Sequence, residues 1–157
     1  MASNRHLGRI IALQTLYEQD FRAECADKTF KLDQVLKRNI NRYKAMVDDP
    51  EFVETLVKGV NKHQIDIDLV LQPVAPDWPI TQIARMDRIV LRMGAYELLH
   101  NNAQVPPKVV INEAVELAKA FGGDNSSKFI NGVLGTVLRQ YEEANSKSKS
   151  KPTKSKK

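Results

Sequence analysis

Basic side chains at the start of the chain have the chemistry to hold a nucleic acid. Arg5, His6 and Arg9 fall on the first turns of an amphipathic helix predicted over residues 4–21. Positive charge at a helix N-terminus opposes the helix dipole, so this choice of residues hints at a ligand of opposite charge. The alternative is that the three side chains only solvate an exposed helix end, and the residue types alone favour that alternative.

A second candidate site is the pair Lys128 and Phe129 near the end of the sequence. The pair opens the last predicted helix, where backbone N–H groups are free, and a cation beside an aromatic ring suits a phosphate and a base. The alternative is that Phe129 is the first core residue of its helix, and the pattern alone favours this core position. The residues therefore allow an RNA contact here without requiring one.

No segment predicts catalysis. The sequence contains no phosphate-binding loop, no dinucleotide-binding fingerprint and no nucleophile elbow. His63, Asp66 and Asp68 have a spacing compatible with a metal, but we interpret them as a solvated helix face. The single cysteine, Cys25, excludes an internal disulfide and a cysteine-rich zinc site. We therefore expect a protein that is not an enzyme and uses neither a cofactor nor a metal.

Composition bounds the class of protein. The chain has 157 residues and is 42% hydrophobic, which fits one globular domain. No apolar run approaches the roughly 18 residues that span a bilayer, and the N-terminus lacks the apolar core of a signal peptide. The chain also has only one cysteine, which fits a reducing compartment. We therefore expect a cytoplasmic protein that makes no membrane contact.

Positive charge is concentrated at the C-terminus. The whole chain carries 24 basic and 19 acidic residues, but residues 146–157 contain six lysines and no acid. Residues 1–145 therefore carry 18 basic and 19 acidic residues, a net charge of −1. We divide the chain into a helical domain, 1–144, and a Ser/Lys-rich tail, 145–157, which we expect to be disordered. A nucleic-acid site on the domain requires local segregation of charge.

The elements that must position the candidate residues are helices, because no stretch alternates with period two. Apolar spacing predicts helices over residues 4–21, 27–47, 50–71, 81–101 and 109–121, and a last helix from about residue 126. The helix over 81–101 is apolar nearly all round, so we place it at the centre. We expect Gly94 and Gly132 to permit close helix packing, and Gly122 and Gly123 to end a helix in the left-handed conformation. Asn125, Ser126 or Ser127 is expected to cap the last helix.

Four segments carry a family resemblance. K-V-V-I-N-E-A-V-E-L-A-K-A-F-G (108–122) and S-K-F-I-N-G-V-L (127–134) together resemble the NusB transcription antitermination factors of bacteria. R-M-D-R-I-V-L-R-M-G-A-Y-E-L-L (85–99) is similar to the family's central helix, and R-H-L-G-R-I-I-A-L-Q-T-L-Y (5–17) matches its opening helix more loosely. The resemblance implies an all-α fold of about seven helices in two small bundles.

The resemblance also implies a function. NusB proteins bind a boxA-like single-stranded RNA together with the ribosomal protein NusE, in an RNA polymerase elongation complex that includes other Nus factors and supports ribosomal RNA transcription. The resemblance places Asp87 on the side that binds NusE, because the family has an acid at that position. The residues that it places on the RNA face are Arg5, His6, Arg9, Tyr17, Lys128 and Phe129.

Two other functions stay open at this point. Some ribosomal RNA cytosine methyltransferases carry a NusB-like domain, so the chain is alternatively an RNA-targeting module that works with an rRNA-modifying partner. The basic residues of the N-terminal helix are interrupted by Leu7 and Gly8. A helical bundle that binds only proteins is therefore the other alternative. Whether the chain forms a homodimer is also left open.

Overall fold

The computed structural model describes residues 5–75, 79–100 and 104–150, with side chains up to residue 146. These residues form seven α-helices and one short 3-10 helix, η1 (Ile80–Gln82), and contain no strand, so the all-α prediction is confirmed. None of these helices has the length and apolar character needed to cross a bilayer. The α-helices are α1 (Arg5–Glu24), α2 (Leu32–Arg42), α3 (Pro50–Lys62), α4 (Gln64–Val74), α5 (Arg85–His100), α6 (Pro107–Phe121) and α7 (Ser126–Ser150).

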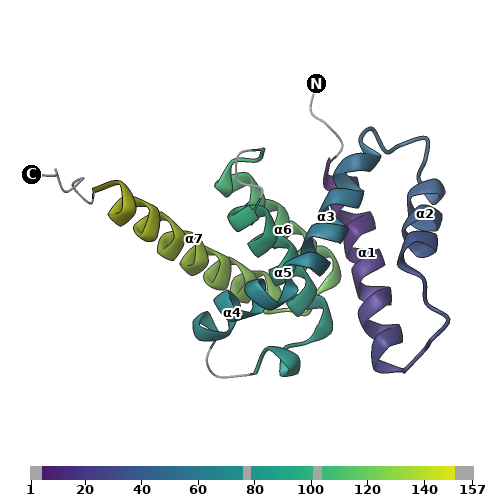
Figure 1. The fold of residues 1–157 in the computed structure, drawn as a ribbon, viewed down its shortest axis with the longest axis horizontal. Helices are drawn as coiled ribbons and strands as arrows, with labels where there is room; N and C mark the ends of the chain where they lie inside the picture. Colours follow the sequence, from purple (N-terminus) through teal and green to yellow (C-terminus); the bar gives the residue numbers. More distant parts are fainter. Residues whose placement is uncertain (1–4, 76–78, 101–103, 151–157) are drawn as a thin grey trace, which may run out of the picture.

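Helix α5 is the centre of the molecule, as its apolar sequence predicts. Every residue from Ile89 to Leu98 is buried. It packs against α1 and α3 on one side and against α4, α6 and α7 on the other, which gives the two groups of helices seen in Figure 1. A Cβ at Gly94 would lie 2.6 Å from Leu134 Cδ1, so the close packing predicted at Gly94 is confirmed, and the structure shows that the partner is α7.

The helix predicted over 50–71 is divided in the structure. Helix α3 ends at Lys62 and α4 begins at Gln64, with His63 between them at φ −104° and ψ 14°. The prediction of one long helix was wrong because a break of one residue leaves the apolar spacing in phase on both sides. The change of direction brings Ile67 and Leu71 fully into the core.

Two glycines differ from expectation. Gly122 ends α6 in an extended conformation, with φ −93° and ψ −172°, so the left-handed prediction was wrong. Glycine is nevertheless required there, because a Cβ would lie 2.6 Å from Ser126 Cβ and 2.8 Å from the Ala118 carbonyl oxygen. A Cβ added at Gly132 would have no described neighbour within 4 Å, so its predicted role in close packing was also wrong.

The last helix extends beyond the predicted domain boundary at residue 144. Helix α7 continues to Ser150, which includes the first residues of the Ser/Lys-rich segment. Residues 151–157 lie outside the described part of the chain. Disorder of the tail therefore stays a prediction.

Candidate nucleic-acid interface

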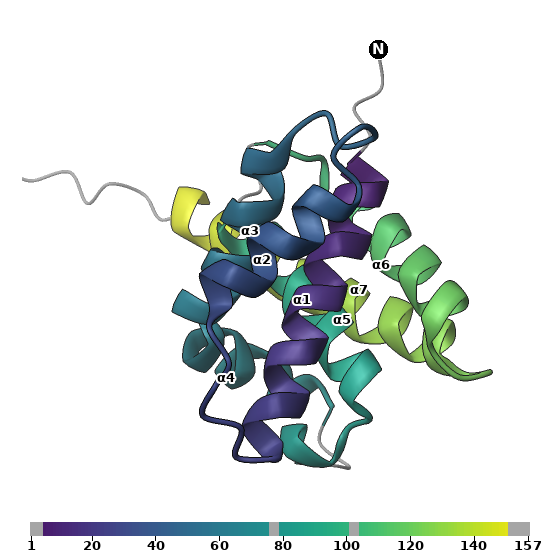
Figure 2. The same cartoon turned by 90° about the vertical axis from the view of Figure 1, so that its right-hand side faces the viewer.

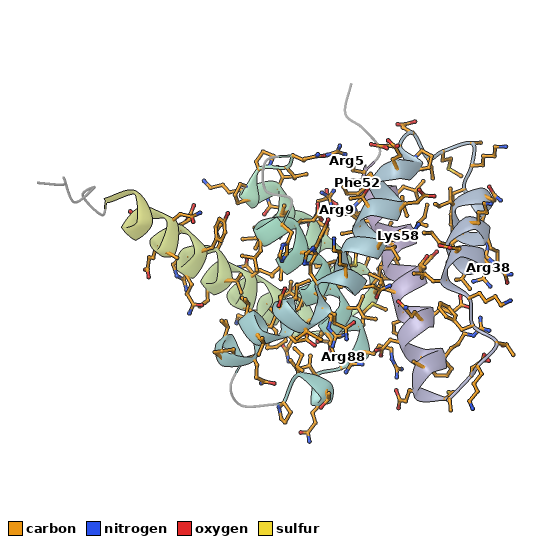
Figure 3. All side chains as sticks on the ribbon, viewed as in Figure 1. Arg5, Arg9, Arg38, Phe52, Lys58 and Arg88 are labelled. Atoms are coloured by element: carbon orange, nitrogen blue, oxygen red, sulfur yellow. The ribbon has the colours of Figure 1, made fainter. Side chains whose placement is uncertain are left out.

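Arg9 lies inside the molecule rather than on its surface. Its side chain is 3% exposed and forms a two-pronged pair with Glu97 of α5, from Nε to Oε2 at 2.9 Å and from Nη2 to Oε1 at 2.8 Å. The guanidinium also stacks over the Phe52 ring of α3, 5.0 Å from its centroid (Figure 3). Arg9 therefore ties α1 to α3 and α5, and a contact between Arg9 and RNA stays a prediction.

His6 and Arg9 share a carboxylate on α6. His6 Nδ1 lies 2.7 Å from Glu113 Oε2, within hydrogen-bond distance, and Arg9 Nη1 lies 4.0 Å from the same oxygen. Half of the His6 side chain is exposed. The pair holds α1 against α6, so the imidazole has a fixed place at the surface where an incoming ligand can reach it.

Arg5 is more accessible than Arg9, with 28% of its side chain exposed. Its guanidinium also lies over the Phe52 ring, 4.8 Å from the centroid, and its Nη2 lies 3.8 Å from Asp49 Oδ2 (Figure 3). Its Nε is buried and has no hydrogen-bond partner among the described residues. An ion pair this long and exposed contributes little, so the guanidinium is available to a phosphate at small cost.

Tyr17 lies farther along α1, beside the start of α5. The guanidinium of Arg85 stacks over the Tyr17 ring at 5.5 Å and over Phe21 at 5.3 Å. Asp20 accepts hydrogen bonds of 2.6 Å from Arg85 Nε and from Arg88 Nη2. Burial alone would raise the pKa of Asp20, but the bonds from the two arginines outweigh it and lower the pKa. This cluster fixes Tyr17 next to the N-terminus of α5.

Asp87 and Phe129 line one groove, although the family resemblance assigns them to different partners. The groove lies between the start of α5 and the turn from α6 to α7, and its apolar wall includes Phe121, which is 42% exposed. Phe129 is half-buried, so part of its ring is open to a ligand while the rest packs on the core. Lys128 is exposed and has no ion pair among the residues described. A base beside Phe129 and a partner at Asp87 would therefore be neighbours.

The turn beneath this groove is held by a serine. Ser126 Oγ accepts a hydrogen bond from the Gly123 N–H at 2.9 Å, and the Ser126 N–H donates to the Gly123 carbonyl at 3.1 Å. Ser126 is one of the three predicted caps for α7, but its side chain bonds backwards to the turn instead. The closed turn positions Lys128 and Phe129 on the first turn of α7.

The sequence did not reveal the carboxylates that organise this face. Nothing in the local pattern distinguishes Glu113, or the neighbouring cation Arg85, from ordinary members of their helical segments. An acid within an otherwise buried helix, as Glu97 is, was the available signal, since a buried charge requires a partner. The partner itself, 88 residues away, cannot be deduced from spacing.

The residues considered for a metal do not converge. Asp68 binds Arg92 through two contacts of 2.9 Å, and His63 Nδ1 lies 4.0 Å from Asp66 Oδ2. Within the described ranges, no group of three or more His, Cys, Asp and Glu side chains is placed to hold a metal ion.

Comparison with known proteins gives one family. The model of the NusB family matches residues 6–139. The chain is 44% identical over 142 residues to the transcription antitermination protein NusB of Chloroflexus aggregans, covering 90% of this chain and 91% of that protein. It is 41% identical over 144 residues to the protein of the same name from Roseiflexus castenholzii, covering 91% and 97%.

Solved structures agree with the fold. NusB of T. maritima superposes with a TM-score of 0.77 at 27% identity, covering 92% of this chain and 99% of that one. A chain from the crystal structure of antitermination factors NusB and NusE in complex with dsRNA superposes with a TM-score of 0.76. That chain is 24% identical, with coverage of 90% and 100%, and its likeness concerns the fold alone.

Proposed function

This chain belongs to the NusB family, and from that premise we propose that it is a transcription antitermination factor that binds a boxA-like single-stranded RNA together with NusE. It does so in the cytoplasm, within an RNA polymerase elongation complex with other Nus factors. The observation that carries the proposal is the family match over residues 6–139, which includes every candidate RNA residue except Arg5. The chain is a binding protein rather than an enzyme.

Three places on the surface divide the work of binding. Phe129 supplies an open aromatic face for a base, and Lys128 beside it supplies a cation for a phosphate. Arg5 and His6 contact the RNA backbone at the first turn of α1, where both side chains are partly exposed. Tyr17 lies beneath Arg85 near the N-terminus of α5, and we assign it a contact with the RNA there. Phosphate contacts position the RNA strand, and the contact with the stacked base gives sequence preference.

NusE is expected to strengthen RNA binding. Residues 1–145 have a net charge of −1, so the domain lacks the positive electrostatic potential needed to bind RNA tightly by itself. Asp87 and Phe129 share one groove, so a partner held at Asp87 would sit beside the RNA. We expect saturating NusE to lower the Kd for a boxA-like RNA by at least about tenfold, a coupling of about 1.4 kcal/mol, measured by fluorescence anisotropy.

Asp87→Asn provides the control for this coupling. The substitution keeps the shape of the side chain and removes its charge, so it should reduce the gain from NusE and leave binding to RNA alone unchanged. An RNA affinity that saturating NusE does not alter would count against the heterodimer. A weaker affinity of the variant for RNA alone would assign Asp87 to the RNA side instead.

The Ser/Lys-rich tail is expected to add RNA affinity without sequence preference. Its six lysines offer phosphate contacts, each contributing roughly −0.7 to the log–log salt slope on a single strand. If about three engage at once, truncation after Asn145 should flatten the slope by about two and weaken target and scrambled RNA alike. A salt series on full-length and truncated protein measures this. Identical slopes would show that the tail stays unbound, and a loss of target preference would show that it reads sequence.

A further inference from the structure

Positive charge is segregated on α2 and its flanks. Residues 28–44 contain six basic residues and one acid, a net charge of +5. The rest of residues 1–145 carries 12 basic and 18 acidic residues, a net charge of −6. This region is thus the positive pole of a domain that is otherwise acidic. We call it the α2 patch, and it consists of Lys28, Lys31, Lys37, Arg38, Arg42 and Lys44.

All six cations of the α2 patch are exposed, and five have no ion pair among the described residues. Arg38 pairs with Glu18, and the one acid, Asp33, faces Lys58 of α3 at 3.7 Å. Lys31 stands at the N-terminus of α2 without a capping bond, where positive charge opposes the helix dipole. Arg38 and Arg42 are like charges four residues apart, an arrangement that costs a few tenths of a kcal/mol. Local stability accounts for Arg42, in the last turn of α2, but not for Lys31 at its N-terminus or for the set as a whole.

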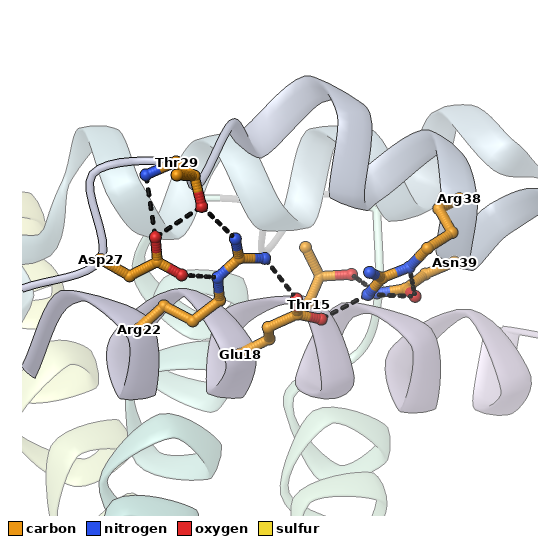
Figure 4. A network of polar contacts seen from close by, with 7 residues as sticks. All are labelled: Thr15, Glu18, Arg22, Asp27, Thr29, Arg38 and Asn39. Carbon is orange, nitrogen blue, oxygen red and sulfur yellow. Dashed lines mark hydrogen bonds and ion pairs between the residues drawn. The ribbon is translucent and has the colours of Figure 1, made fainter. Parts of the chain in front are cut away.

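A network of polar contacts holds the patch on α1 (Figure 4). Asn39 of α2 is buried and donates from Nδ2 to Thr15 Oγ1 at 2.9 Å. Arg22 of α1 binds Asp27 and Glu18 at 2.8 Å each and Thr29 at 3.1 Å. Hydrogen bonds from the Thr29 hydroxyl and N–H, and from Arg22, lower the pKa of Asp27 to about 2. Asp27, the acid next to the patch, is thus already bonded to Arg22 and Thr29. The same network holds α2, and with it the cations of the patch, in a fixed position.

The α2 patch lies apart from the candidate interface. Helix α2 packs on α1 and α3, and α6 lies on the other side of α1 in both views (Figures 1 and 2). The exposed side chains of α2 are Asp33, Lys37 and Asn41 along one row and Gln34, Arg38 and Arg42 beside it, and Lys44 follows just past the end of the helix. The nearby aromatic rings, Phe30 and Tyr43, are half-buried. A face of cations without open rings suits phosphates rather than bases.

We propose that the α2 patch binds the phosphate backbone of RNA that flanks the boxA-like segment. The proposal rests on the proposed function, because it extends the path of the same RNA around α1. Protein interfaces are anchored by aromatic and apolar side chains at their centre, and the face of α2 offers lysines and arginines instead. Contacts of this kind add affinity and salt dependence without sequence preference.

The test compares two double variants of the full chain by anisotropy across a salt series. Lys37→Ala/Arg42→Ala removes two charges from the patch, and Lys62→Ala/Arg139→Ala removes two exposed charges from α3 and α7. Each protein is titrated with a short RNA that carries only the boxA-like segment and with a longer RNA that has flanks. For the patch variant on the longer RNA, we expect a log–log slope flatter by about 1.4, from two contacts at roughly −0.7 each. The short RNA and the control variant should show no change.

The outcomes separate this proposal from the proposed function. Equal slopes for the patch and control variants on the longer RNA would overturn the patch. An equal loss on both RNAs would overturn its placement on the flanks. An unchanged slope with a lost response to NusE would assign the patch to a protein partner and overturn RNA as its ligand. If the unmodified protein shows no preference for the boxA-like RNA, the proposed function fails, while the slope comparison still tests the patch.

Discussion

Arg9→Ala is expected to lower the free energy of unfolding by about 3–5 kcal/mol, because it leaves the buried carboxylate of Glu97 without its partner. Arg9 and Glu97 are each 3% exposed on their side chains and are joined by two short hydrogen bonds. The variant should therefore unfold at a markedly lower urea concentration, with far-UV circular dichroism as the measurement.

Arg5→Ala is the matched control for this prediction. Arg5 lies one turn earlier on α1 and stacks over the same Phe52 ring, but its ion pair with Asp49 is long and partly exposed. Its loss should cost less than about 1 kcal/mol. A similar small loss for Arg9→Ala would show that the Arg9–Glu97 pair does not hold the helices together.

Replacing both partners shows how much of the lost stability comes from leaving the Glu97 charge buried and unpaired. Arg9→Met/Glu97→Leu removes the two charges together and fills the space with apolar groups, so it should recover most of the stability lost in Arg9→Ala. RNA binding by this folded double variant then reports whether Arg9 has any part in the interface. Retained affinity would make Arg9 a support for α1, and reduced affinity would place it in contact with RNA.

The sequence predicted what depends on local periodicity. The central position of α5, the burial of its residues and the close packing at Gly94 all followed from apolar spacing over one segment. The break at His63 did not, because the apolar residues of α3 and α4 keep the same phase across it. Gly122 was placed correctly at the end of α6, but its conformation depends on Ser126 and Ala118, which crowd the turn.

The candidate site was predicted in residue type and only partly in arrangement. The sequence selected Arg5, His6 and Arg9 as one cluster, yet the structure divides them by depth, with Arg9 beneath and Arg5 at the surface. This division is set by the carboxylates of Glu97 and Glu113, which come from other helices. Spacing along one helix cannot report which side chain a distant acid draws inward.

Phe129→Leu is expected to weaken binding to a boxA-like RNA by about 5- to 150-fold, the equivalent of about 1–3 kcal/mol for one stacked base. Phe129 is half-buried, so its ring has both a packed part and an open part. Leucine keeps the apolar contact with the core but offers no flat face to a base. The change in unfolding free energy should stay below about 1.5 kcal/mol.

Phe30→Leu is the control, because Phe30 is also half-buried but lies beyond α1, under Arg22. It should show the same modest loss of stability and no loss of RNA affinity. Titrations of both variants at one salt concentration, with urea melts alongside, separate the two roles of the ring. If Phe129→Leu loses stability and keeps its RNA affinity, Phe129 is a core residue only, and the base must stack elsewhere in the groove, where Phe121 is the exposed ring that remains.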